Sequence, residues 1–179
     1  VDPFFDVAYA SRALFYKQRG EDDLALEDFK KTVLINPVQP TIYNDLGNIY
    51  NRKRDFPSAI ESYNLALKYD PLLMETYLNR GIAFSTLKMY SMALNDFNQA
   101  LQINPLDVKA LYQRSEVYAQ SGRIDEALED DNNLIKMIPD YGLLYFNRSK
   151  IYKLKQDKQK AMEDALRAKA LGWDVDEEY

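Results

Sequence analysis

Eight charged residues recur with one spacing and could form ion pairs. In four of five successive 34-residue segments an arginine is followed sixteen residues later by an aspartate, and the second segment lacks both. The pairs are Arg12 and Asp28, Arg80 and Asp96, Arg114 and Asp130, and Arg148 and Asp164. A guanidinium and a carboxylate can form two parallel hydrogen bonds, which are stronger than neutral ones. The pattern therefore predicts four structural salt bridges, each joining two helices of one segment.

Asp131 is a second candidate for chemistry, because it occupies a position that is apolar in the other segments. The corresponding residues are Phe29, Tyr63, Phe97 and Ala165. A buried carboxylate could serve in catalysis or bind a metal ion, but the chain contains no Cys, no His and no second acidic cluster to assist it. We therefore expect the helix to be rotated or loosened here, so that Asp131 reaches solvent or an arginine. We predict no catalytic residue, no metal site and no cofactor.

The composition excludes several classes of function. Hydrophobic residues make up 46% of the 179 residues and charged residues 28%, as in a folded soluble chain. The net charge is −5, and four acidic residues lie among the last six, so 176–179 read as an acidic tail. Because the chain has no basic excess, we expect no nucleic-acid partner. No apolar stretch is long enough to predict membrane insertion. The compartment stays open, with the cytoplasm slightly favoured.

The elements that position these residues follow from a repeat of 34 residues. Prolines mark the period at Pro3, Pro37, Pro71, Pro105 and Pro139, and alanines at Ala25, Ala59, Ala93, Ala127 and Ala161. Each segment contains two apolar patterns of helical spacing separated by a short polar turn. In the second segment the patterns predict helices over 41–52 and 56–69. We call the first helix of each segment helix A and the second helix B.

This pattern resembles the tetratricopeptide repeat. The residues that carry the resemblance are the series Tyr43, Leu46, Gly47, Tyr50, Ala59, Tyr63, Ala66 and Pro71 and its copies. The resemblance implies an all-α fold, a right-handed superhelix (α-solenoid) of antiparallel helix pairs, and protein binding without catalysis. It assigns repeats to 6–39, 40–73, 74–107, 108–141 and 142–175. It also leaves 1–5 as the remnant of a preceding repeat or a linker. The chain is then expected to form a single continuous array.

The last repeat departs from the others in a way typical of a capping repeat. Lys158 and Lys169 stand where the corresponding residues of earlier repeats are mostly apolar, and Trp173 replaces the periodic proline. A terminal repeat needs a polar outer face. We therefore expect the array to stop at 175.

One side of each helix A faces away from helix B, and the resemblance implies that this side lines a concave groove. The residues predicted to form the groove are Leu14, Lys17, Asn44, Asn48, Asn51, Arg52, Leu78, Asn79, Ile82, Lys109, Tyr112, Gln113, Glu116, Phe146, Asn147 and Lys150. Its apolar members could form pockets for partner side chains, and its amides could bind a peptide backbone. The leading hypothesis is a non-enzymatic scaffold or adaptor that binds a peptide or helix of a partner protein in this groove.

Two other functions stay open from the sequence. Chains could form homo-oligomers through the N-terminal end, where Phe4 and Phe5 add apolar surface. The chain could also be a binding segment of a larger enzyme or signalling protein. Capture of a chaperone tail is disfavoured, because Asn44 and Gln113 stand where that subfamily of repeats uses cations to bind carboxylates.

Overall fold

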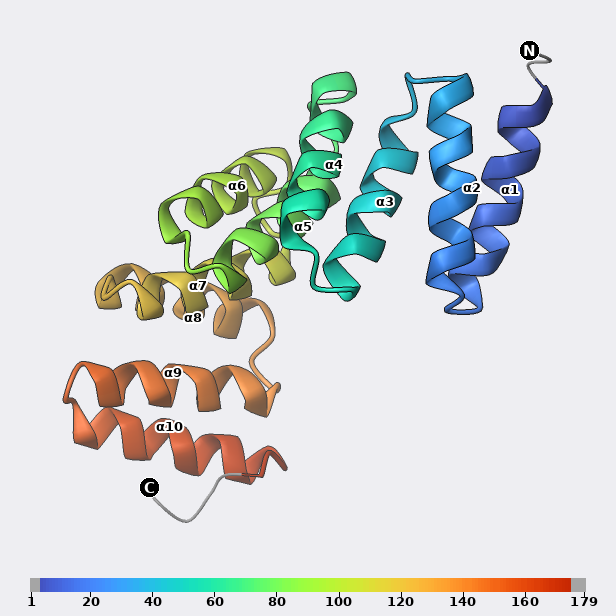
Figure 1. Ribbon diagram of the computed structural model, residues 1–179. Helices are drawn as coiled ribbons and strands as arrows, with labels where there is room; N and C mark the ends of the chain where they lie inside the picture. Colours follow the sequence, from blue (N-terminus) through green and yellow to red (C-terminus); the bar gives the residue numbers. More distant parts are fainter. Residues whose placement is uncertain (1–3, 175–179) are drawn as a thin grey trace. The chain divides into compact units, whose positions relative to one another are not determined.

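The computed structural model describes residues 4–174, and in this range the chain forms ten α-helices and no strand (Figure 1). The helices are α1 (Phe4–Gln18), α2 (Asp22–Ile35), α3 (Pro40–Arg52), α4 (Phe56–Tyr69), α5 (Met74–Thr86), α6 (Tyr90–Ile103), α7 (Val108–Gln120), α8 (Ile124–Met137), α9 (Gly142–Leu154) and α10 (Lys158–Ala170). Odd-numbered helices are the predicted helices A, and even-numbered helices are the predicted helices B. The all-α fold class is confirmed.

Local sequence explains where these helices begin and turn. The side chains of Asp55, Asp107 and Asp157 accept hydrogen bonds from backbone N–H groups in the first turns of α4, α7 and α10. Every turn from helix A to helix B contains a left-handed residue at one repeat position. These residues are Gly20, Arg54, Lys88, Gly122 and Gln156. A left-handed residue reverses the chain within a few residues, so the two helices of a repeat pack side by side.

The packing of helix A on helix B rests on small residues at fixed places. Contacts join α1 to α2 and α3 to α4, and likewise α7 to α8 and α9 to α10. The periodic alanines of the helices B are at most 2% exposed. At Gly47 an added Cβ would lie within 3 Å of the ring of Tyr63, which is fully buried. The small residue in α3 therefore makes room for the aromatic side chain from α4.

Two features of the structure concern the predicted division of the chain into repeats, which stays a prediction. The helix α1 begins at Phe4, so it includes two of the five residues that the sequence prediction places before the first repeat. The chain divides into two compact units, Val1–Met89 and Tyr90–Tyr179. In a repeat protein each repeat contacts only its neighbours, so no central core spans the whole chain. The predicted acidic tail lies outside the described residues.

Candidate functional site

The charged pairs lie between helices, and two of them link three helices each. Arg114 of α7 donates two hydrogen bonds to Asp130 of α8, at 2.8 and 2.7 Å, and one to Asn98 of α6, at 2.7 Å. Arg148 of α9 repeats this arrangement with Asp164 of α10 and Asn132 of α8. The aspartates are at most 9% exposed in both pairs. These hydrogen bonds hold α7 and α9 against the helices on either side of them.

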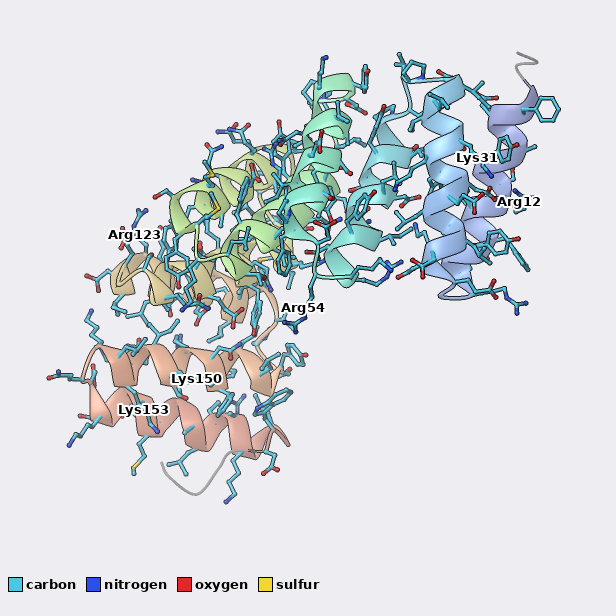
Figure 2. The ribbon with its side chains drawn as sticks, in the orientation of Figure 1. Arg12, Lys31, Arg54, Arg123, Lys150 and Lys153 are labelled. Carbon is cyan, nitrogen blue, oxygen red and sulfur yellow. The ribbon has the colours of Figure 1, made fainter. Side chains whose placement is uncertain are left out.

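The first compact unit contains one such pair and part of another. Arg12 of α1 bonds Asp28 of α2, beside Lys31 (Figure 2), and its guanidinium holds the pKa of Asp28 below its ordinary value. Arg80 of α5 donates to Asn64 of α4. The predicted bond from Arg80 to Asp96 would join the two units and stays a prediction. The sequence carried a signal for the missed acceptors, since Asn64, Asn98 and Asn132 also recur every 34 residues.

In the first unit the predicted groove residues include a cluster of amides on α3 and α5. Asn48 Oδ1 accepts a hydrogen bond from the hydroxyl of Tyr63 at 2.8 Å and another from Asn79 Nδ2 at 2.9 Å. Asn44 Oδ1 accepts from the hydroxyl of Thr76 at 3.0 Å. The buried phenol of Tyr63 thus sets the orientation of Asn48. We call the amides of Asn44, Asn48 and Asn79, together with the hydroxyl of Thr76, the amide cluster.

The other predicted groove residues of this unit have varied surroundings. Lys17 and Arg52 form ion pairs with Asp45 and Asp22 from neighbouring helices. The remaining residues are Leu14, which is exposed, Ile82, which is half-buried, and Asn51, whose Oδ1 is buried without a hydrogen-bond partner in the described chain. Leu78 is only 3% exposed. The expectation of an accessible apolar contact at Leu78 is therefore wrong, because neighbouring atoms already cover this side chain.

In the second unit the predicted groove residues surround a pocket of about 160 Å³ between α7, α8 and α9. Its lining residues are Tyr112, Ser115, Glu116, Ala119 and Gln120 from α7, Asp131 from α8, and Asn147, Lys150, Ile151 and Leu154 from α9. Four of the groove predictions are among them, at positions 112, 116, 147 and 150. Lys109 and Gln113 of α7, which are exposed and half-buried, do not line this pocket.

The prediction for Asp131 is wrong, because this side chain lies in the interior. Asp131 is 2% exposed, and its Oδ1 accepts a hydrogen bond of 2.7 Å from the hydroxyl of Ser115. Its Oδ2 has no hydrogen-bond partner among the described residues. The sequence pattern located the exceptional residue but not its environment. The helix keeps its register here, since the preceding Asp130 still meets Arg114.

Burial sets the electrostatics of this pocket. Desolvation raises the pKa of Asp131 to about 7, against an ordinary value of 3.8. The hydrogen bond from Ser115 and the charge of Arg148 oppose this rise, whereas the carboxylates of Asp130 and Glu116 add to it. Burial also raises the pKa of Tyr112, with a further contribution from Glu116. The pocket therefore contains a carboxyl group that changes its ionisation near neutral pH.

Phe146 takes part in aromatic packing in the N-terminal half of α9. The ammonium of Lys150 lies 4.2 Å from the centroid of the Phe146 ring, and the ring of Trp173 lies 6.3 Å from it. The single tryptophan thus covers part of α9 where the other repeats have a proline. Within residues 4–174 no group of acidic residues is arranged to hold a metal ion, and none of the helices has the length and apolar character needed to cross a membrane.

Comparison with known proteins agrees with this architecture. Models of the tetratricopeptide repeat match residues 40–71, 75–106 and 97–129. The crystal structure of YrrB, described as a TPR protein with an unusual peptide-binding site, is 23% identical and has a TM-score of 0.82 over 91% of this chain and 84% of YrrB. No curated protein matches the chain by sequence.

Two MamA structures are also similar in fold. A crystal structure of MamA is 22% identical, with a TM-score of 0.88 over 93% of this chain and 91% of that protein. MamA 41-end from Desulfovibrio magneticus RS-1 is 18% identical, with a TM-score of 0.90 over 96% of both chains. The repeat models and these structures agree with the antiparallel helix pairs described above. The chain therefore belongs to the tetratricopeptide repeat family, whose fold is that of a protein-interaction scaffold.

Proposed function

We propose that the protein is a non-enzymatic adaptor that binds an extended peptide or a helix of a partner protein on the helix A faces of its repeats. The observation that carries this proposal is the amide cluster on α3 and α5. The bonds from Tyr63 and Asn79 both use the oxygen of Asn48 and hold its side chain in one orientation. An oriented amide presents its N–H₂ group to a peptide carbonyl at little entropic cost.

The second unit supports the proposal with a different surface. Its pocket lies among four predicted groove residues, so one side chain of a bound peptide has a place to enter. The described YrrB structure, which has a similar fold, contains a peptide-binding site. Surfaces of this kind recognise partners by shape and hydrogen bonding, which is consistent with a chain that lacks Cys and His.

The test is selection of peptides from a random phage-displayed library on the purified chain, followed by affinity measurement with synthetic peptides. We expect Asn79→Ala in the first unit and Tyr112→Ala in the second to weaken binding at least tenfold, the loss of one well-placed contact. Lys68→Ala and Lys136→Ala on helices B are matched controls that should bind as the unaltered chain does. Equal affinity for all four variants would place the binding surface elsewhere.

A second candidate function is self-assembly through α1. Phe5, Val7 and Phe15 are each more than half exposed on this helix. Exposed apolar side chains can take part in an interface. Light scattering over a dilution series distinguishes the two functions, since an assembly through α1 dissociates on dilution and is weakened by Phe15→Asp, whereas a monomeric adaptor keeps one mass throughout.

A further inference from the structure

The pocket in the second unit exists because a small side chain replaces a ring. In the second repeat, Tyr63 of α4 fills the space between α3 and α5, and Gly47 leaves room for it. In the fourth repeat the corresponding residues are Asp131 and Ser115, which are bonded to each other. The carboxylate is shorter than a phenol ring, so a cavity of about 160 Å³ lies beside it. A cavity of this size accommodates a group as large as benzene.

The lining of the pocket combines apolar and polar side chains, and it includes one buried hydrogen-bond acceptor, Asp131. Ala119 and Ile151 contribute apolar surface from α7 and α9. Asp131 contributes an oxygen, Oδ2, that has no partner in the described chain, and Glu116 lines the same pocket. An unpartnered buried acceptor is costly, and a donor from an occupant removes that cost. The lining therefore suits a side chain with an apolar stem and an N–H donor at its tip.

The charges around Asp131 favour a cation over other donors. Glu116 from α7 and Asp130 from α8 are acidic, and Asp130 is already bonded to Arg114. On α9, Arg148 is bound to Asp164 and Asn132, and Lys150 (Figure 2) lies against the ring of Phe146. Neither Arg148 nor Lys150 donates a hydrogen bond to the unpartnered oxygen. A cation that enters the pocket can form a charge-assisted hydrogen bond with Asp131.

We propose that this pocket binds the ammonium or guanidinium end of a basic side chain in the partner peptide. The proposal rests on the proposed function, because it assigns the pocket to one residue of the bound peptide. The stem of that side chain contacts Ile151 and Ala119, and its N–H group donates to Asp131. Asn147 lines the same pocket, and its amide interacts with the phenol of Tyr112. As the cation enters, Asp131 releases its proton to solvent.

The first experiment needs no peptide. The chain labelled with ¹³C and ¹⁵N is titrated with n-butylammonium chloride, n-butanol and sodium butyrate at constant ionic strength, and the Asp131 carboxyl and the Ser115 and Ile151 signals are followed by NMR. We expect saturable shifts with n-butylammonium and an affinity about tenfold higher at pH 8 than at pH 6, because Asp131 ionises between them. Equal binding of n-butanol or butyrate, or no shift with n-butylammonium, would overturn the proposal.

Two variants test whether the pocket and its charge are both needed. Asp131→Asn keeps the volume and the acceptor for Ser115 but removes the charge, so n-butylammonium should bind at least tenfold more weakly. The double variant Ser115→Gly and Asp131→Tyr reproduces the pair of the second repeat and should fill the pocket, which abolishes binding. Circular dichroism and Trp173 fluorescence check that both variants fold. Undiminished binding to a folded Asp131→Asn chain contradicts the proposal.

A peptide experiment separates this inference from the proposed function. Each basic residue of a selected peptide is replaced by norleucine, which keeps the stem and removes the charge. We expect one replacement to weaken binding about tenfold in the unaltered chain and to have little effect in Asp131→Asn. If peptides bind but no replacement is coupled to Asp131, the adaptor function stands and the cation pocket is refuted. If n-butylammonium binds and no peptide does, the proposed function fails alone.

Discussion

Asp131→Asn tests whether a buried carboxyl makes the stability of this protein fall as the pH rises. Asparagine has the same shape and can still accept the hydrogen bond from Ser115, but it cannot ionise. In the folded chain burial raises the pKa of Asp131 to about 7, against 3.8 ordinarily. The folded state therefore holds the proton more tightly than the unfolded state, and stability is lost as the pH rises from the lower to the higher of these values.

The size of the effect follows from the two pKa values. Between pH 5 and pH 8 the ionisation of Asp131 costs the folded state roughly 2–3 kcal/mol more than the unfolded state. If the free energy of unfolding falls by about 2–3 kcal/mol per molar urea, this cost lowers the midpoint of urea unfolding by about 1 M. The chain has no histidine that would titrate in the same range. The substitution should remove most of the decrease between the two pH values.

The assay is urea unfolding at pH 5 and pH 8, followed by circular dichroism and by the fluorescence of Trp173. This residue packs near Phe146 of α9 and reports on the unit that contains Asp131. Asp140→Asn is the control, because the side chain of Asp140 is 85% exposed. If the unaltered chain and Asp131→Asn lose stability equally between pH 5 and pH 8, the account of a buried, protonated carboxyl is refuted.

Three other substitutions test the packing rules of the repeats. Arg148→Met should lower the free energy of unfolding by roughly 1–3 kcal/mol, because it leaves the buried carboxylate of Asp164 unpaired. Arg12→Met should lower it less, because Asp28 keeps Lys31 at 3.8 Å; equal losses in urea unfolding would contradict this. Gly47→Ala should lower the free energy of unfolding by about 1–3 kcal/mol, because the added methyl group overpacks the ring of Tyr63. An unchanged thermal midpoint would show that the ring can shift. Lys88→Gly should raise the free energy of unfolding by about 1 kcal/mol, because Lys88 has a φ of 58°, which is unfavourable for a residue with a Cβ atom. A lower thermal midpoint would refute this.

Much of the fold was predictable because it is local. The 34-residue period, the helix bounds near 41–52 and 56–69, and the family depend on spacing along the chain, and spacing is visible in a sequence. The positions of Arg114 and Asp130 also predicted the contact between them, because a helix–turn–helix of constant length brings residues sixteen apart together. Similar reasoning would have found Asn98 and Asn132, which share the period.

The candidate site depended on what surrounds each residue. The sequence showed that Asp131 replaces an aromatic residue, but the expectation that it reaches solvent was wrong, since the helix keeps its register and three helices enclose the side chain. Leu78 was expected in the groove and is covered. By itself the sequence determined the repeat, its helices and the paired charges, because these follow from periodicity. Only the tertiary structure decided which polar atoms are buried without partners and where a ring-sized space is left, because burial depends on atoms contributed by neighbouring helices.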